Sequence, residues 1–145
     1  DVEGALAVGA TRDKVATMRR FGEAVGMAFQ IQDDILDYTP SAQTGKPVCN
    51  DLREGKITLP LLTVLDRASE ERRADLLDRL ARCHEDDEAV EYLRLAVERE
   101  GGLSAAAEVM QGYVSRAVGM LSDYDDSDYR SALVNLCAYI VERDR

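Results

Sequence analysis

Three aspartates with helical spacing are the residues of this sequence best suited to carry out chemistry. Asp33, Asp34 and Asp37 lie in a stretch without proline or glycine, and Gln30 precedes them on the same face. At about 100° per helical residue, Asp33 and Asp37 are about 40° apart around the helix axis, and Asp34 is about 60° from Asp37. Hard divalent cations such as Mg2+ bind through carboxylate oxygens and through the phosphates of a substrate. This acidic face is therefore a candidate metal site.

The negative charge of the three aspartates requires a cationic partner. Carboxylates three and four residues apart on a helix repel one another, and the helix C-terminus is already the negative end of the helix dipole. The following loop supplies Lys46 and Lys56, whose ammonium groups suit phosphate oxygens. An EF-hand is disfavoured because the acids do not occupy alternate positions of a loop. The remaining alternative is a solvated acidic patch that pairs with arginines of the same segment, namely Arg12, Arg19 and Arg20.

The aspartates require a helix that ends just after them, and the sequence predicts one over residues 12–38. It begins near Thr11 or Asp13, and Pro40 prevents its continuation. The positions expected on its buried side recur every three or four residues: Val15, Met18, Phe21, Val25, Phe29 and Gln32. Small residues on the same helix would let a neighbouring helix approach closely: Gly22, Ala24, Gly26 and Ala28.

Beyond a loop at residues 39–55, helical patterns fill the rest of the chain. Long loops in compact domains are commonly functional, and this one carries charged residues. Further helices are predicted over residues 57–68, from a cap at Ser69 to about 83, from Asp86 or Asp87 to 101–102, from Ser104 to about 121, and over 127–141. No alternating strand pattern competes with them, so the predicted fold class is all-α.

The composition limits the class of protein. A chain of 145 residues fits at most one ordinary domain, and its 46% of hydrophobic residues can form a core. The formal net charge of −10 argues against a nucleic-acid or anionic-membrane surface. The longest apolar run is too short for a transmembrane helix. The odd number of cysteines (Cys49, Cys83 and Cys137) makes no disulfide framework, which favours a reducing compartment and a cytoplasmic location.

The joint pattern of acids and loop resembles a known family. Residues 26–37, GMAFQIQDDILD, are similar to the second aspartate-rich motif of the trans-isoprenyl diphosphate synthases, or polyprenyl synthetases. Residues 45–62, GKPVCNDLREGKITLPLL, resemble the loop that follows this motif in the family, and residues 139–145 resemble its C-terminal helix. The resemblance spans nearly the whole chain and implies a larger all-α bundle around a central cavity.

The resemblance implies a metal site that uses Mg2+. Asp33, Asp34 and Asp37 match the acids that hold the ion, directly or through water, against an allylic diphosphate. Asp51 matches a loop acid that supports the metal shell. The implied reaction is the head-to-tail condensation of isopentenyl diphosphate with the allylic diphosphate to make a polyprenyl diphosphate.

Substrate contacts are implied in the same way. Lys46 and Lys56 match lysines that neutralise the departing diphosphate, and with Asp33 they are the expected catalytic residues. Gln30 matches a polar residue beside the site, and Phe29 an aromatic residue that faces the prenyl chain and the developing carbocation. The family resemblance also implies a homodimer.

Two departures from the family pattern matter. The first aspartate-rich motif has no counterpart, so residues 1–145 are expected to be the C-terminal half of a longer synthase and inactive alone. Cys49 stands where the family usually has glycine, which matters if that position needs an unusual backbone angle. The missing motif motivates one alternative, a non-catalytic partner subunit of a heteromeric synthase. A terpene-cyclase-type lyase of the same fold is a third possibility, which the lysine-rich loop disfavours.

Overall fold

The structure is a computed structural model that describes residues 2–40, 45, 48–123 and 127–142, with side chains described for 12–40, 45, 48–122 and 130–142. These residues form α-helices and one short 3-10 helix without any strand, so the all-α prediction is confirmed for the described ranges. The elements are α1 (Val2–Leu36), α2 (Asn50–Arg53), α3 (Leu59–Arg67), α4 (Glu70–Arg82), α5 (Asp87–Arg99), α6 (Gly102–Met120), η1 (Leu121–Asp123) and α7 (Ser127–Glu142). None of the described helices is both long enough and apolar enough to cross a membrane.

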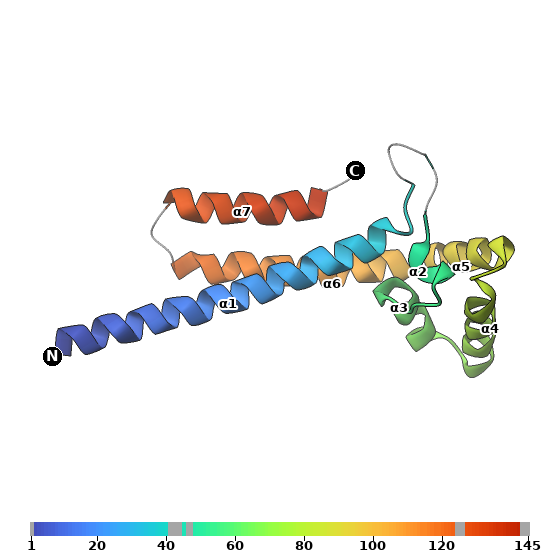
Figure 1. Cartoon of the computed structure of the whole chain (residues 1–145), viewed down its shortest axis with the longest axis horizontal. Coiled ribbons are helices and arrows are strands. Elements are labelled where there is room, and N and C mark those ends of the chain that lie inside the picture. Colours follow the sequence, from blue (N-terminus) through green and yellow to red (C-terminus); the bar gives the residue numbers. More distant parts are fainter. Residues whose placement is uncertain (1, 41–44, 46–47, 124–126, 143–145) are drawn as a thin grey trace.

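Helices α1, α6 and α7 form the long part of the molecule (Figure 1). Helix α1 crosses α6, and its N-terminal end extends beyond the ends of both α6 and α7. Their shared core contains Ala28 and Ile31 of α1, Ala106 and Met110 of α6, and Ile140 of α7. This packing supplies the stability of a helix whose sequence contains several glycines.

The buried stripe of α1 differs from the predicted one. Phe21, Ala24, Ala28 and Ile31 are buried, whereas Val15 is 54% exposed and Phe29 is 42% exposed. Helix α6 approaches along the two alanines, because small side chains allow two helix axes to come close. The predicted close approach is thus confirmed at Ala24 and Ala28, while the added Cβ atoms of Gly22 and Gly26 would meet nothing within 4 Å.

A second core lies at the other end of the molecule, where α3, α4 and α5 pack together near the start of α6 (Figure 1). It contains leucines of α3, α4 and α5, and also Tyr38, Cys49 and Leu52 from the segments that follow α1. The close contact between α3 and α6 depends on Gly102. A Cβ atom there would lie 2.9 Å from methyl carbons of Val64 and Val97, so only glycine fits without a shift.

The helix starts show which local signals the chain uses. The Ser69 hydroxyl accepts the N–H of Arg72 at 3.1 Å, and Asp86 accepts the N–H of Glu88 at 2.9 Å, so the predicted starts of α4 and α5 are confirmed. Helix α1 begins at Val2 instead of near residue 12. Helix α6 begins at Gly102 and not at Ser104, because Gly101 takes the capping position with a φ of 82°.

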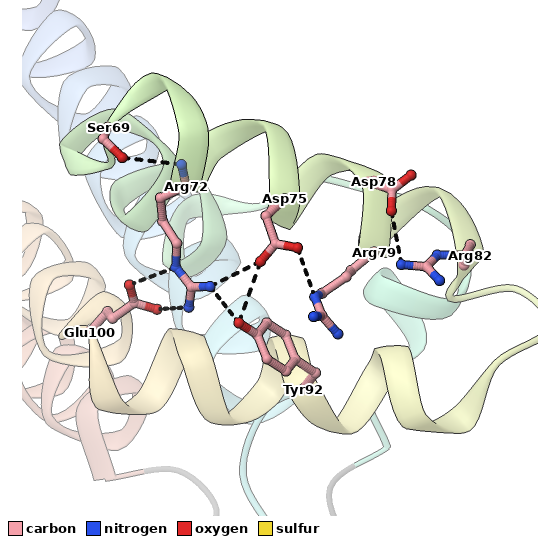
Figure 2. A network of polar contacts seen from close by, with 8 residues as sticks. All are labelled: Ser69, Arg72, Asp75, Asp78, Arg79, Arg82, Tyr92 and Glu100. Carbon is pink, nitrogen blue, oxygen red and sulfur yellow. Dashed lines mark hydrogen bonds and ion pairs between the residues drawn. The ribbon is translucent and has the colours of Figure 1, made fainter.

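An ionic network joins α4 to α5 (Figure 2). The Arg72 guanidinium forms two hydrogen bonds with the Glu100 carboxylate, at 3.2 and 2.9 Å, and a third with Asp75 at 3.1 Å. Arg72 also donates to the hydroxyl of Tyr92, and the guanidinium of Arg79 lies 3.5 Å from the centre of the Tyr92 ring. Such bidentate and cation–π contacts fix one helix on the next.

Candidate functional site

The acidic residues lie at the C-terminal end of α1. Asp33 and Asp34 belong to the helix, which ends at Leu36, and the N–H of Asp37 still reaches the carbonyl oxygen of Asp33 at 3.1 Å. The next two residues close the turn, because Tyr38 and Thr39 donate to the carbonyl oxygens of Ile35 and Leu36. The helix therefore presents Asp33 and Asp34 on its last turn and places Asp37 at the point where the chain leaves it.

Asp37 connects the end of α1 to α2. Its Oδ1 accepts the backbone N–H of Asn50 at 2.9 Å, and its Oδ2 accepts that of Asp51 at 3.0 Å. Its own carbonyl oxygen accepts the N–H of Cys49 at 2.9 Å. Asp37 thus caps the N-terminus of α2 from outside that helix, a role normally filled by the N-cap residue itself.

Cys49 occupies that N-cap position with a left-handed backbone, at φ 52° and ψ 39°. A side chain in this region costs about 1–2 kcal/mol relative to glycine. The Cys49 side chain is 2% exposed and makes no capping hydrogen bond. The position does require an unusual backbone angle, as the comparison with the family's glycine suggested.

Asp34 and Asp51 come within electrostatic reach of each other. Burial raises the pKa of Asp34, a hydrogen bond from Gln30 at 3.0 Å acts in the opposite direction, and the charges of Asp51 and Asp37 raise the pKa further. Burial, followed by the charge of Asp37, also raises the pKa of Asp51, and Lys56 opposes this. Three carboxylates thus gather between α1 and α2, while Asp33 is exposed on the neighbouring face of α1.

The donor chemistry fits a divalent cation bound together with a phosphorylated ligand. Within the described ranges, no three or more His, Cys, Asp or Glu side chains are arranged to hold a metal ion. Mg2+ does not need such a cage, because it is usually bound by one or two carboxylates with water and substrate phosphates completing its shell. The charge of Asp51 contributes to the raised pKa of Asp34, after burial, and a cation between the two carboxylates would relieve that repulsion.

Of the two lysines predicted to bind phosphate, the structure describes only Lys56. Lys56 forms an ion pair with Glu54 at 2.8 Å, and both side chains are exposed. Its backbone N–H donates to the carbonyl oxygen of Asp51 at 2.8 Å, and Gly55 makes the intervening turn with a φ of 74°. The structure therefore brings Lys56 close to the acidic loop. Lys46 lies outside the described residues.

The remaining expected residues lie on α1. Gln30 donates to Asp34, as stated above, and the exposed ring of Phe29 precedes it in the same helical turn. One contact was not foreseen: Arg53 of α2 pairs with Asp87 of α5 at 2.7 Å. No local signal could reveal it, because the two residues are 34 positions apart.

The comparison with known proteins agrees with this geometry. The family model described as polyprenyl synthetase matches residues 3–97 of the chain. The chain belongs to the polyprenyl synthetase family. The match includes α1, the acidic residues and the loop that carries α2.

Individual members of the polyprenyl synthetase family support the same conclusion. The chain is 35% identical to a short chain isoprenyl diphosphate synthase of Methanothermobacter thermautotrophicus, over 97% of this chain and 43% of that protein. It is also 35% identical to heptaprenyl diphosphate synthase component 2 of Geobacillus stearothermophilus, again over 97% and 43% of the two chains. The chain therefore spans less than half the length of these relatives.

A solved polyprenyl synthase has the same fold. The crystal structure of polyprenyl synthase from Caulobacter crescentus, complexed with calcium and isoprenyl diphosphate, superposes with a TM-score of 0.80 and 32% identity. The superposition covers 98% of this chain and 44% of that one. The fold is therefore that of the all-α isoprenoid synthases.

Proposed function

We propose that this chain is the C-terminal half of a trans-polyprenyl diphosphate synthase. The observation that carries the proposal is the meeting of Asp34, Asp37 and Asp51 at the end of α1, in a chain that belongs to the polyprenyl synthetase family. In the proposed reaction, the C–O bond of an allylic diphosphate breaks and its electron pair leaves with the diphosphate. The double bond of isopentenyl diphosphate forms the new C–C bond, and loss of a proton restores neutrality at carbon.

The acidic residues would hold Mg2+ in this reaction. Asp33, Asp34 and Asp51 are the proposed carboxylate ligands, directly or through water, and Asp37 lies beside them with both carboxylate oxygens bonded to backbone N–H groups. When bound, the metal offsets the negative charge of the departing diphosphate. Support comes from the donor set, which is oxygen only, and from the pKa values of Asp34 and Asp51, which are raised by burial and then by neighbouring acids.

Other side chains would act on the substrate itself. Lys56, and Lys46 outside the described residues, are proposed to bind the oxygens of the diphosphate, which requires Lys56 to exchange its exposed partner Glu54. An exposed ion pair of this kind is weak and therefore easily exchanged. Gln30 would orient Asp34 through the hydrogen bond that it already donates. Phe29 would shield the allylic cation from water with its ring.

The experiment is prenyl transfer by the full-length protein with Mg2+, an allylic diphosphate and labelled isopentenyl diphosphate. Asp34→Asn and Asp51→Asn should each lower kcat by about 100-fold, because each removes charge from a preorganised electrostatic site. Asp66→Asn removes an exposed carboxylate of α3 and serves as the matched control, with a change of at most about twofold. Unchanged turnover in both site variants would contradict the proposal.

A second candidate is a subunit of a heteromeric synthase in the cytoplasm. The relative named heptaprenyl diphosphate synthase component 2 favours it, because the likeness covers 97% of this chain. A homodimer is the proposed alternative assembly. Native mass spectrometry of the protein purified from its own cells separates the two: one polypeptide species supports the homodimer, and two different species in one active complex support the heteromer.

A further inference from the structure

Asp37 makes three hydrogen bonds to the segment that begins at Cys49, and all three go to backbone N–H groups. Both carboxylate oxygens are engaged, with Asn50 and Asp51, and the carbonyl oxygen is engaged with Cys49. Asp37 is thus bound to the backbone of this segment through both its side chain and its main chain.

Helix α2 needs contacts outside itself: Leu52 packs it into the core of α3, α4 and α5, and Asp37 binds its first amides. It has four residues, and isolated helices of that length are not stable in water because nucleation is unfavourable. Its N-cap residue, Cys49, has a side chain that makes no capping hydrogen bond. The ion pair between Arg53 and Asp87 is largely exposed, so it fixes the C-terminal end of α2 only weakly.

We propose that Asp37 is a positioning residue, which acts by capping α2 and so holds Asp51 beside Asp34, rather than a direct ligand of the metal. The proposal rests on the proposed function for the meaning of this site. The position of α2 also fixes the position of Lys56, because the backbone N–H of Lys56 donates to the carbonyl oxygen of Asp51. A shift of α2 would therefore move an acid and a lysine together, and displacements of about 1 Å in such a site can cost about 100-fold in rate.

A capping role and a metal-ligand role of Asp37 predict opposite effects for the Asn and Glu substitutions. Asn keeps the side-chain length and one oxygen, which can still accept one of the two backbone N–H groups, but its NH2 group cannot accept the other. Asn also loses the charge that binds a metal. Glu keeps the carboxylate but extends it by one methylene, which moves the oxygens away from the amides of Asn50 and Asp51. The positioning role therefore predicts that Asn preserves more of the site than Glu does.

The test uses the full-length protein with Asp37→Asn, Asp37→Glu and Asp37→Ala. Backbone hydrogen exchange is measured at Asn50 and Asp51, together with kcat and the Mg2+ concentration that gives half-maximal rate. We expect exchange to be faster by about tenfold or more at both amides in the Glu and Ala variants, but at only one of the two amides in the Asn variant. We also expect kcat to fall by about 100-fold with Glu and less than about tenfold with Asn, with the Mg2+ requirement of the Asn variant unchanged.

The opposite order, with Glu active and Asn inactive, would overturn the proposal, and so would equal losses in both. Unaltered exchange at Asn50 and Asp51 in the Ala variant would also overturn it, because α2 would then not depend on Asp37. If the unsubstituted protein transfers no prenyl group, the proposed function fails. The exchange measurement still decides whether Asp37 holds α2, so the two failures can be distinguished.

Discussion

The carbonyl oxygen of Pro60 lies against the Cα atom of Gly102, where a Cβ atom would overlap it. Gly102 is the first residue of α6, and in the interior of a helix alanine is normally more stable than glycine by about 1 kcal/mol. The overlap with Pro60, Val64 and Val97 should reverse that sign. The contact therefore explains on steric grounds why glycine is favoured at this position.

The first prediction is that Gly102→Ala lowers the free energy of unfolding by about 2 kcal/mol, as overpacking does elsewhere. The measurement is equilibrium unfolding of the purified full-length protein in urea. Gly112→Ala is the matched control in the same helix, because a Cβ atom there meets nothing within 4 Å. That control should gain about 1 kcal/mol. A stabilised Gly102→Ala variant would show that α3 can move away from α6 at little cost.

The second prediction concerns the left-handed backbone of Cys49. Cys49→Gly and Cys49→Ala both remove the sulfur and differ only in the Cβ atom, which is unfavourable in a left-handed backbone. The free energy of unfolding should therefore be higher in the Gly variant than in the Ala variant by about 1 kcal/mol. At Cys83, where φ is −61°, the same pair should show the reverse order by about 0.4–1 kcal/mol. Urea unfolding of the four variants is the check, and the same order at both positions would refute the backbone explanation.

The third prediction concerns the pH dependence of stability at alkaline pH. Burial, followed by the charge of Asp37, raises the pKa of the Cys49 thiol from 9.0 to about 11. A group whose pKa is higher in the folded state stabilises the fold below its unfolded pKa and loses that contribution as pH rises through the folded value. The free energy of unfolding should therefore fall between about pH 9 and about pH 11, and fall less steeply in Cys49→Ala. Parallel pH curves for the two proteins would contradict this.

The fourth prediction concerns the buried hydroxyl of Tyr38. Within the described part of the chain it has no hydrogen-bond partner, and Tyr38 is 2% exposed. Tyr38→Phe should therefore leave stability unchanged or raise it by about 1 kcal/mol, because an unsatisfied polar group is removed.

Tyr92→Phe is the control for this change. The Tyr92 hydroxyl accepts from Arg72, so its loss should lower stability by about 1 kcal/mol. Thermal unfolding of both variants measures the difference. Equal destabilisation of the two would mean that the Tyr38 hydroxyl has a partner.

The sequence predicted those features that depend on local spacing. The starts of α4 and α5 followed from Ser69 and Asp86, because a capping side chain acts within three residues. The placement of Asp33 and Asp34 near the C-terminal end of a helix followed from the local helical pattern alone. The family followed from two adjacent motifs, which are also local patterns.

Features that depend on tertiary packing were not predictable in this way. The buried side of α1 runs through Ala24 and Ala28 because α6 approaches there, and periodicity favoured the larger Val15 and Phe29 instead. The buried Gln32 was placed correctly on the inner side, but its hydrogen bond to the carbonyl oxygen of Val141 joins residues 109 positions apart. For the same reason the capping contact of Asp37 with α2 had no sequence signal.

The two cores described above meet at the acidic site. Asp33 and Asp34 belong to α1, which packs with α6 and α7. Asp51 lies between Cys49 and Leu52, which belong to the core of α3, α4 and α5. The spacing between the two sets of acids therefore depends on the packing of α3, α4 and α5 against α1 and α6, as well as on the cap by Asp37. A substitution far from every carboxylate, such as one at Gly102, can therefore alter the site by shifting α3, α4 and α5 relative to α1.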